Sequence, residues 1–373
     1  MATLWTRCEG RDVDTKTTVV FVAVVGARFL VPLLIPLFPL PAILAALVLD
    51  GVDQSIFQAF GHDPPEYQGY DKAMDVYYLA IAYLSTMRNW ASRPAVRVAR
   101  FLYFYRLVGV VAFELSGWRP LLLIFPNTFE YFFIVYEAIR LRWDPARFGP
   151  RFWIVVAAVI WIFVKLPQEW WIHIAQRDFT DTLAANAWLG PTLAAVLVVV
   201  LLVCWFVVRP RLPARDHGWR VAADPLPEDM DEAAERDRWV ARHGRLWSTG
   251  TLEKVALMGL LWVIYASVLP GIDASSAELF LGVAVFVVLN AAFSLGVARR
   301  SRSLESAVAA FGVRVVLNAV LVVLAGWLLG AGDLDRGDAL FFVLLLSLIT
   351  LLDDRFRPVH EARFAPARTG SAG

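Results

Sequence analysis

Long apolar runs constrain this chain more than any other feature of its sequence. Residues 193–208 and 279–289 contain no charged side chain. A soluble globular chain has about 25% charged residues. Here only 18% of the 373 residues are charged, while 58% are hydrophobic. This composition excludes a soluble enzyme, a disordered chain and a nucleic-acid binder. It predicts an all-α, polytopic transmembrane helix bundle whose main partner is the lipid bilayer.

A helix needs about 20 mostly apolar residues to cross the hydrocarbon core of a membrane. This rule predicts eleven spans, with a single sizeable soluble segment between the seventh and the eighth. The predicted spans are 18–37, 40–59, 72–88, 96–116, 120–139, 152–169, 190–208, 253–270, 277–297, 304–328 and 338–353. The domains expected from them are an N-terminal tail (1–17), a seven-span bundle (18–208), a cytoplasmic loop with a short amphipathic helix (209–252), a four-span bundle (253–353) and a cytoplasmic tail (354–373).

Arginine placement predicts the orientation of the spans. The arginine-rich segments 88–100, 140–151, 209–254, 299–302 and 355–368 follow alternate spans, so they lie on one side of the bundle. Cytoplasmic loops carry the excess of basic residues, which predicts an outside N-terminus and a cytoplasmic C-terminus. Arginine makes up 31 of the 35 basic residues, as in proteins from GC-rich bacterial genomes. We therefore expect a multi-pass protein of a bacterial inner membrane.

Several ionisable residues fall inside predicted spans. Such residues are costly in a bilayer and generally have a partner or face water. Arg28 and Asp50 are equidistant from the turn between the first two spans, and Arg106 and Glu130 from the turn between the fourth and fifth, so each pair is expected at one depth. Arg314 has no acid opposite it in its own hairpin and is a candidate contact for an anionic ligand. These groups predict either structural charge pairs or a polar path through the bundle.

The richest polar region is an aspartate group on the second and third spans. Asp50 and Asp53 are three residues apart, and Asp71 and Asp75 are four apart, so each pair shares one helix face. Two helices that each present two carboxylates could hold Mg²⁺ or another divalent cation. Such hard cations prefer oxygen ligands, and substrate phosphates often complete the coordination shell. The arginine pattern places this group near the outer face of the membrane.

The aspartate spacing resembles the motif of the CDP-alcohol phosphatidyltransferases, in which two aspartate pairs lie on successive transmembrane helices. The resemblance covers about 26 residues (50–75), and Gln54 stands where that motif has a glycine. It implies that Asp50, Asp53 and Asp71 are metal ligands. It further implies that Asp75 is the catalytic base that activates an acceptor alcohol, and that the substrate is a phosphate-bearing lipid.

A second polar cluster leaves the sixth span on the outer side. Lys165, Glu169, His173 and Arg177 recur every four residues and therefore share one helix face. One interpretation is an amphipathic helix at the membrane interface with ion pairs between successive turns. The other makes Glu169 and His173 a catalytic acid/base pair or a proton relay. Both polar clusters are expected on the same face of the membrane and could converge on one cavity.

Three functions are compatible with these patterns. The first is a membrane enzyme in which a carboxylate-bound cation positions a phosphate-bearing or lipid-linked substrate. The second is an ion- or proton-coupled transporter that uses the intramembrane charges as a path. The third is a non-catalytic scaffold or accessory subunit.

Overall fold

The computed structural model describes residues 15–59, 67–176, 182–183, 185–243, 248–268, 316 and 336–365. Within these ranges the chain is helical and no strand occurs. The helices of the first half are α2 (Thr15–Leu30), η1 (Val31–Leu34), α3 (Pro39–Ala59), α4 (Tyr67–Asn89), α5 (Arg93–Ser116), α6 (Pro120–Ile124), α7 (Thr128–Arg140) and η2 (Pro145–Arg147). Those of the second half are α8 (Pro150–Val159), η3 (Ile160–Lys165), α9 (Leu166–Glu169), η4 (Trp170–Ile174), α11 (Leu189–Val203), η5 (Cys204–Val208), η6 (Arg209–Arg211), α12 (Ala233–His243), α13 (Thr249–Val268) and α16 (Arg336–Phe364).

Three helical stretches of the described chain are long and apolar enough to cross a membrane. They are Pro120–Arg140, Pro150–Ile174 and Leu189–Arg211. The other predicted spans in the described ranges are also helical. The predicted spans 277–297 and 304–328 lie outside the described residues.

Some helix ends differ from the sequence-based bounds. The helix of the sixth predicted span continues beyond residue 169 to Ile174, and α16 continues past residue 353 to Phe364. The predicted cytoplasmic tail therefore begins inside α16. The last turns of α16 are mostly polar and extend that helix beyond its apolar part. The residues that extend the sixth span, Trp170–Ile174, are mostly apolar and continue the same helix.

Local sequence explains where several helices begin and end. Proline occupies the first turn of α5, α6 and α8, where its missing N–H costs no hydrogen bond. Gly117 ends α5 in the left-handed conformation, with φ of 65°. Pro167 lies within the long helix between π-helical turns at 160–165 and 170–174, where the usual hydrogen-bond ladder is shifted.

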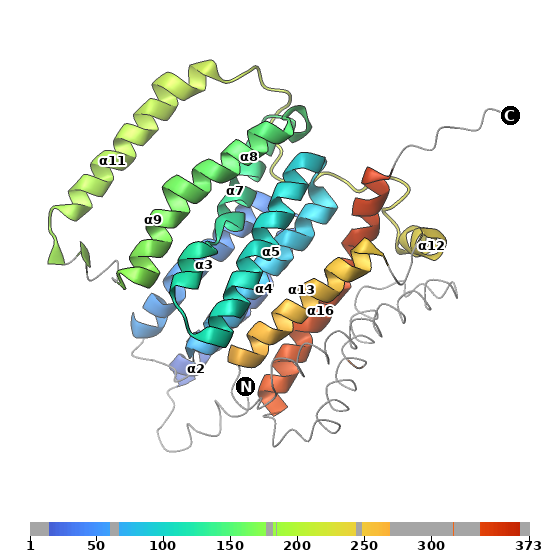
Figure 1. The fold of residues 1–373 in the computed structure, drawn as a ribbon, viewed down its shortest axis with the longest axis horizontal. Coiled ribbons are helices and arrows are strands. Elements are labelled where there is room, and N and C mark those ends of the chain that lie inside the picture. The colour runs from blue at the N-terminus through green and yellow to red at the C-terminus, as the bar shows by residue number, and fades with distance from the viewer. Residues whose placement is uncertain are drawn as a thin grey trace.

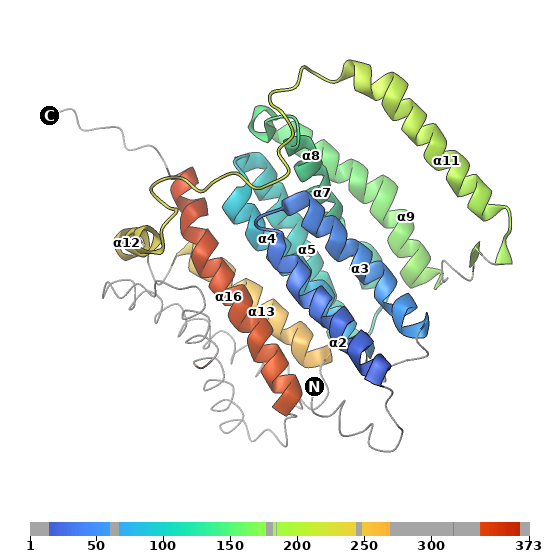
Figure 2. The ribbon, with the colours of Figure 1, turned by 180° about the vertical axis from the view of Figure 1, so that it is seen from behind.

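Helices α2, α3, α5, α7, α8, α13 and α16 share one hydrophobic core with α4, which lies at its centre (Figures 1 and 2). α13 and α16, from the predicted four-span bundle, pack directly on α4 and α5 of the predicted seven-span bundle. α11 stands apart from the others at the edge of the molecule in Figure 1, and none of its described side chains is buried. The two predicted bundles therefore form one packed body in the described residues.

Parts of the arginine-rich segments 88–100, 209–254 and 355–368 lie at one end of this body. Arg88 donates to the carbonyl of Pro36, and Arg363 donates to the carbonyls of Arg88 and Trp90. The backbone N–H of Ala223, in the loop after α11, donates to the carbonyl of Leu37. Turns and loops far apart in the sequence therefore meet around the last turn of α4.

Trp90 lies at the centre of the aromatic core, so its replacement by alanine should destabilise the protein. Trp90 is fully buried, stacks on Tyr136 with ring centroids 3.7 Å apart, and donates through Nε1 to Glu137 at 2.8 Å. Trp90→Ala should lower the free energy of unfolding by about 3–5 kcal/mol, because it leaves a large cavity. Thermal unfolding in detergent measures the change. The exposed Trp188→Ala is the matched control, and an equal effect of both variants would contradict the assigned core.

Candidate functional site

The candidate site is built around a buried arginine that binds four aspartates. Nη1 of Arg28 donates to Asp53 and Asp71, and its Nη2 donates to Asp50 at 2.5 Å and to Asp75 at 2.6 Å. One guanidinium on α2 thus connects two carboxylates from α3 with two from α4. The expected pairing of Arg28 with Asp50 is present as part of this larger group.

Three of the four carboxylates have the geometry of a metal site. One oxygen each of Asp50, Asp71 and Asp75 lie within 4.8 Å of one another. Their side chains are 27%, 38% and 40% exposed, so the group is accessible from outside the core. Asp53 is only 5% exposed and lies beneath them against Arg28. These carboxylates could hold a metal ion.

The structure groups the aspartates differently from the motif resemblance. The resemblance gives Asp53 as a ligand and Asp75 as the base, whereas the clustered oxygens belong to Asp50, Asp71 and Asp75. The helix spacing explains the geometry. Asp71 and Asp75 are one turn apart on α4, so their carboxylates lie on the same face of the helix. Asp53 is buried and contacts Arg28.

A chain of buried polar groups crosses from α4 to α7 and on to α9. Tyr78, three residues after Asp75, donates to Oε1 of Glu130 at 2.7 Å. Nδ2 of Asn127 donates to Oε2 of Glu130 at 2.9 Å, and the backbone N–H of Asn127 donates to Glu169 at 3.2 Å. Asn127 therefore holds two carboxylates from different helices.

The second polar cluster of the sequence forms the end of this chain. Glu169 lies 3.1 Å from Nζ of Lys165 and 3.0 Å from Nε2 of His173, one turn to each side. The Lys165–Glu169 ion pair expected from the four-residue repeat is thus formed, and His173 lies within hydrogen-bonding distance of Glu169. Lys165 and Glu169 are buried, and His173 is partly exposed at the rim. Arg177 lies outside the described residues.

Two other candidate residues behave differently. Arg106 donates to the carbonyl of Phe125 at 2.9 Å, while Glu130 accepts from Tyr78 and Asn127. The equal-depth argument placed Arg106 and Glu130 on neighbouring helices, but the hydrogen bonds of each go elsewhere. Arg314 lies outside the described residues.

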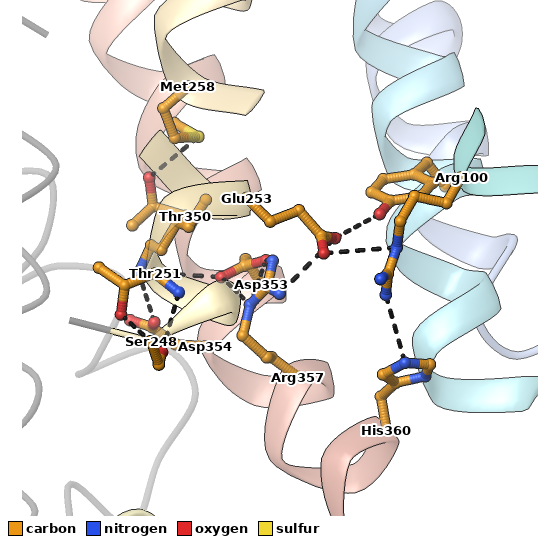
Figure 3. Close-up of polar contacts among 12 residues, drawn as sticks. Arg100, Ser248, Thr251, Glu253, Met258, Thr350, Asp353, Asp354, Arg357 and His360 are labelled. Carbon is orange, nitrogen blue, oxygen red and sulfur yellow. Dashed lines mark hydrogen bonds and ion pairs between the residues drawn. The ribbon is translucent and has the colours of Figure 1, made fainter. Parts of the chain in front are cut away.

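Sequence reasoning missed a second network, at the arginine-rich end of the body (Figure 3). Glu253 accepts from Tyr83 and lies 3.3 Å from Nε of Arg100 and 3.6 Å from Nη1 of Arg357. Arg357 also binds Asp353, one turn earlier on α16. These residues come from α4, α5, α13 and α16. The only sequence signal is the four-residue spacing of Asp353 and Arg357, which does not identify the distant partners.

Lys254 and Gly250 add to the contacts of this network. Nζ of Lys254 lies 2.5 Å from Asp354. A Cβ at Gly250 would lie 2.7 Å from Oε1 of Glu361, so only glycine fits the approach of α13 to α16 without a shift. The network is closely packed and fixes α13 and α16 on α4 and α5.

No family model, no curated protein and no solved structure matches this chain. The functional interpretation therefore rests on the residues and the geometry described above.

His360 predicts a pH dependence of stability. It lies beyond the predicted span 338–353, 3.4 Å from Nη2 of Arg100. Burial away from water, with Arg100 and further arginines nearby, lowers the pKa of His360 to about 3. The unfolded chain binds a proton near pH 6.5 that the folded chain does not, so stability is lost as the pH falls from there towards 3. The loss from this residue should be about 1 kcal/mol between pH 7.5 and 5.5.

The test compares melting temperatures at these two pH values. His360→Gln should lose less stability on acidification than the wild type. His217→Gln, in the loop after α11, is the control and should keep the wild-type slope. An unchanged slope in His360→Gln would contradict the assignment. The other charged groups near His360 are Arg93, Arg357 and Arg363.

Proposed function

We propose that this chain is a multi-pass protein of a bacterial inner membrane that binds a divalent cation through Asp50, Asp71 and Asp75. The bound cation positions a phosphate-bearing or lipid-linked substrate for metal-assisted transfer. The observation that carries the proposal is the convergence of three partly exposed carboxylates from two helices within 4.8 Å.

The charge of the site supports a cation. Arg28 supplies one positive charge against the four carboxylates that it binds. Carboxylates held this close repel one another unless they are protonated or bind a positive charge. A divalent ion such as Mg²⁺ takes oxygen ligands and keeps positions open for substrate phosphate oxygens. In this proposal Asp53 is a positioning residue that holds Arg28, and Asp75 is a ligand.

The position of the site in the body supports the outer-side location. Asp75 lies 13 residues before Arg88, or about 20 Å along α4 at 1.5 Å per residue. Arg88 belongs to the arginine-rich end, which we assign to the cytoplasm. We extend the membrane assignment to all eleven predicted spans on the basis of their apolar length. In the described helices, buried charges such as Arg28 and Glu130 have partners within the bundle.

The cation proposal predicts saturable binding of Mn²⁺ or Mg²⁺ to the purified protein in detergent. Asp75→Asn should weaken binding by more than about tenfold, because affinity follows the number of charged ligands. Electron paramagnetic resonance of Mn²⁺, or calorimetry with Mg²⁺, measures it. The exposed Asp229→Asn is the matched control.

The Asp53→Asn variant distinguishes a cation site of three carboxylates from one in which Asp53 is a fourth ligand. It should retain more affinity than Asp75→Asn. Absence of saturable binding to the wild type, or equal binding by wild type and Asp75→Asn, would refute the proposal. If the wild type binds the cation and Asp75→Asn does not, an assay for divalent-dependent formation of a lipid product tests the transfer step.

The orientation predicts thiol accessibility in intact cells. In a chain with Cys8 and Cys204 replaced by serine, Ala187→Cys should react with a membrane-impermeant maleimide, and Arg215→Cys should not. Ala187 precedes α11 and Arg215 follows it, and both residues are exposed. The opposite labelling pattern would place the aspartates on the cytoplasmic side.

A transporter is the second candidate, and the buried chain from Tyr78 through Glu130 and Asn127 to Glu169 favours it. Polar side chains that follow one another across spanning helices often mark ion or proton pathways. Proteoliposome flux that is abolished by Glu130→Gln would support this function. Equal flux in the variant and the wild type would exclude this series of polar side chains as the path of the transported ion or proton.

A further inference from the structure

The arginine-rich end carries a basic and aromatic surface that the aspartate site does not use. The surface combines the segment after α7 (140–151) with the segment after α11 (209–224). Together these contain eight arginines and three aspartates: Arg140, Arg142, Arg147, Arg151, Arg209, Arg211, Arg215, Arg220, Asp144, Asp216 and Asp224. The surface therefore has a clear excess of positive charge.

Carboxylates occupy some of these arginines. Arg140 binds the buried Glu137 at 2.6 Å, and Arg147 lies 2.8 Å from Asp216. Arg220 lies 3.6 Å from Asp224. The acids that contact arginines in this region therefore bind Arg140, Arg147 and Arg220. The guanidiniums of other arginines there can bind an external anion.

Two arginines instead stack on exposed tryptophans. The guanidinium of Arg142 lies 4.4 Å from the ring centroid of Trp219, and that of Arg209 lies 4.1 Å from Trp205. Within the described ranges, neither arginine forms an ion pair. Trp205 is 59% exposed and Trp219 is 69% exposed. Each pair thus presents a positive charge beside an uncovered apolar ring.

The loop after α11, which forms part of this surface, is held against the segment after α7 by hydrogen bonds. The backbone N–H groups of Asp216 and Arg220 donate to the carbonyls of Arg142 and Leu141, at 3.1 Å and 3.2 Å. Nε1 of Trp143 donates to the carbonyl of Pro213 at 3.1 Å. Figure 1 shows the loop running from α11 past the ends of α7 and α8. The segments after α7 and α11 therefore form one surface.

The position of the tryptophans indicates the kind of partner. Trp205 and Arg209 lie in the last turns of the apolar stretch Leu189–Arg211, where a spanning helix reaches the headgroup level. Tryptophan prefers this level because its ring is apolar and its N–H is polar, and arginine there reaches phosphate groups. A nucleic acid or a free anion would use the charges but would have no need of exposed rings at this depth.

We propose that this surface binds the headgroups of anionic phospholipids, with the Arg142–Trp219 pair and the Arg209–Trp205 pair as its two contact points. At each point the guanidinium binds phosphate oxygens, and the ring packs against the glycerol and the upper acyl chains. The proposal rests on the membrane location proposed above but is independent of the cation site.

Native mass spectrometry of the delipidated full chain tests the site, with phosphatidylglycerol and phosphatidylcholine as probes. The wild type should prefer phosphatidylglycerol. R142Q/R209Q should weaken phosphatidylglycerol binding by about thirtyfold, since each arginine near an anionic headgroup contributes about fivefold. R238Q/R242Q removes the same charge from α12 and should behave as the wild type.

Equal binding of the two lipids by the wild type would overturn the proposal, as would equal loss in the two double variants. Displacement of the lipid by millimolar inorganic phosphate would also overturn it, in favour of a free-anion site. Trp219→Ala keeps the charge and provides a second test if R142Q/R209Q does not fold. It should also reduce the preference for phosphatidylglycerol. Mn²⁺ binding should be unchanged in all these variants, which separates failure of this site from failure of the cation site.

Discussion

The contact between Arg28 and four aspartates is the constraint on which the candidate site depends. A guanidinium buried in a helix bundle is costly unless carboxylates surround it. Here Arg28 on α2 binds the aspartates of α3 and α4 and so brings the three helices together. The same contact gives the carboxylates different roles. It buries Asp53, and it holds Asp50, Asp71 and Asp75 with their oxygens close together and partly exposed. A cation would therefore enter a site that Arg28 has already organised.

The two ends of the body differ in chemistry. The aspartate group lies well away from the last turn of α4, whereas Arg88 and Arg363 donate to backbone carbonyls around that turn. At that end Glu253, Asp353 and Arg357 connect α13 and α16 to the first half of the chain. At the arginine-rich end, ion pairs therefore hold helices together, and the lipid site that we propose lies on this side. At the aspartate end, carboxylates remain accessible to a ligand.

The sequence predicted contacts within one helix better than contacts between helices. The four-residue repeat of Lys165, Glu169 and His173 produces the observed contacts because residues one turn apart always share a helix face. The equal-depth argument brought Arg28 to Asp50 but did not give Arg106 and Glu130 as hydrogen-bond partners. Depth is only one coordinate, and rotation of each helix about its axis decides which side chains meet. Tyr78 on α4 binds Glu130 on α7 because that rotation points it there, whereas Asn127 lies only three residues before Glu130.

The amino-acid sequence by itself determined the helical class, the positions of most described helices and the helix faces that carry the aspartates and the Lys165–His173 repeat. These follow from apolar length, proline and glycine positions and helical spacing, all of which are local. The tertiary structure decided that Asp75 joins Asp50 and Asp71 while Asp53 is buried, and that Glu253 meets Arg100 and Arg357 across three helices. It also decided that Arg142 stacks on the exposed Trp219. Such contacts join residues distant in the chain. They depend on how whole helices and loops pack, which local spacing does not encode.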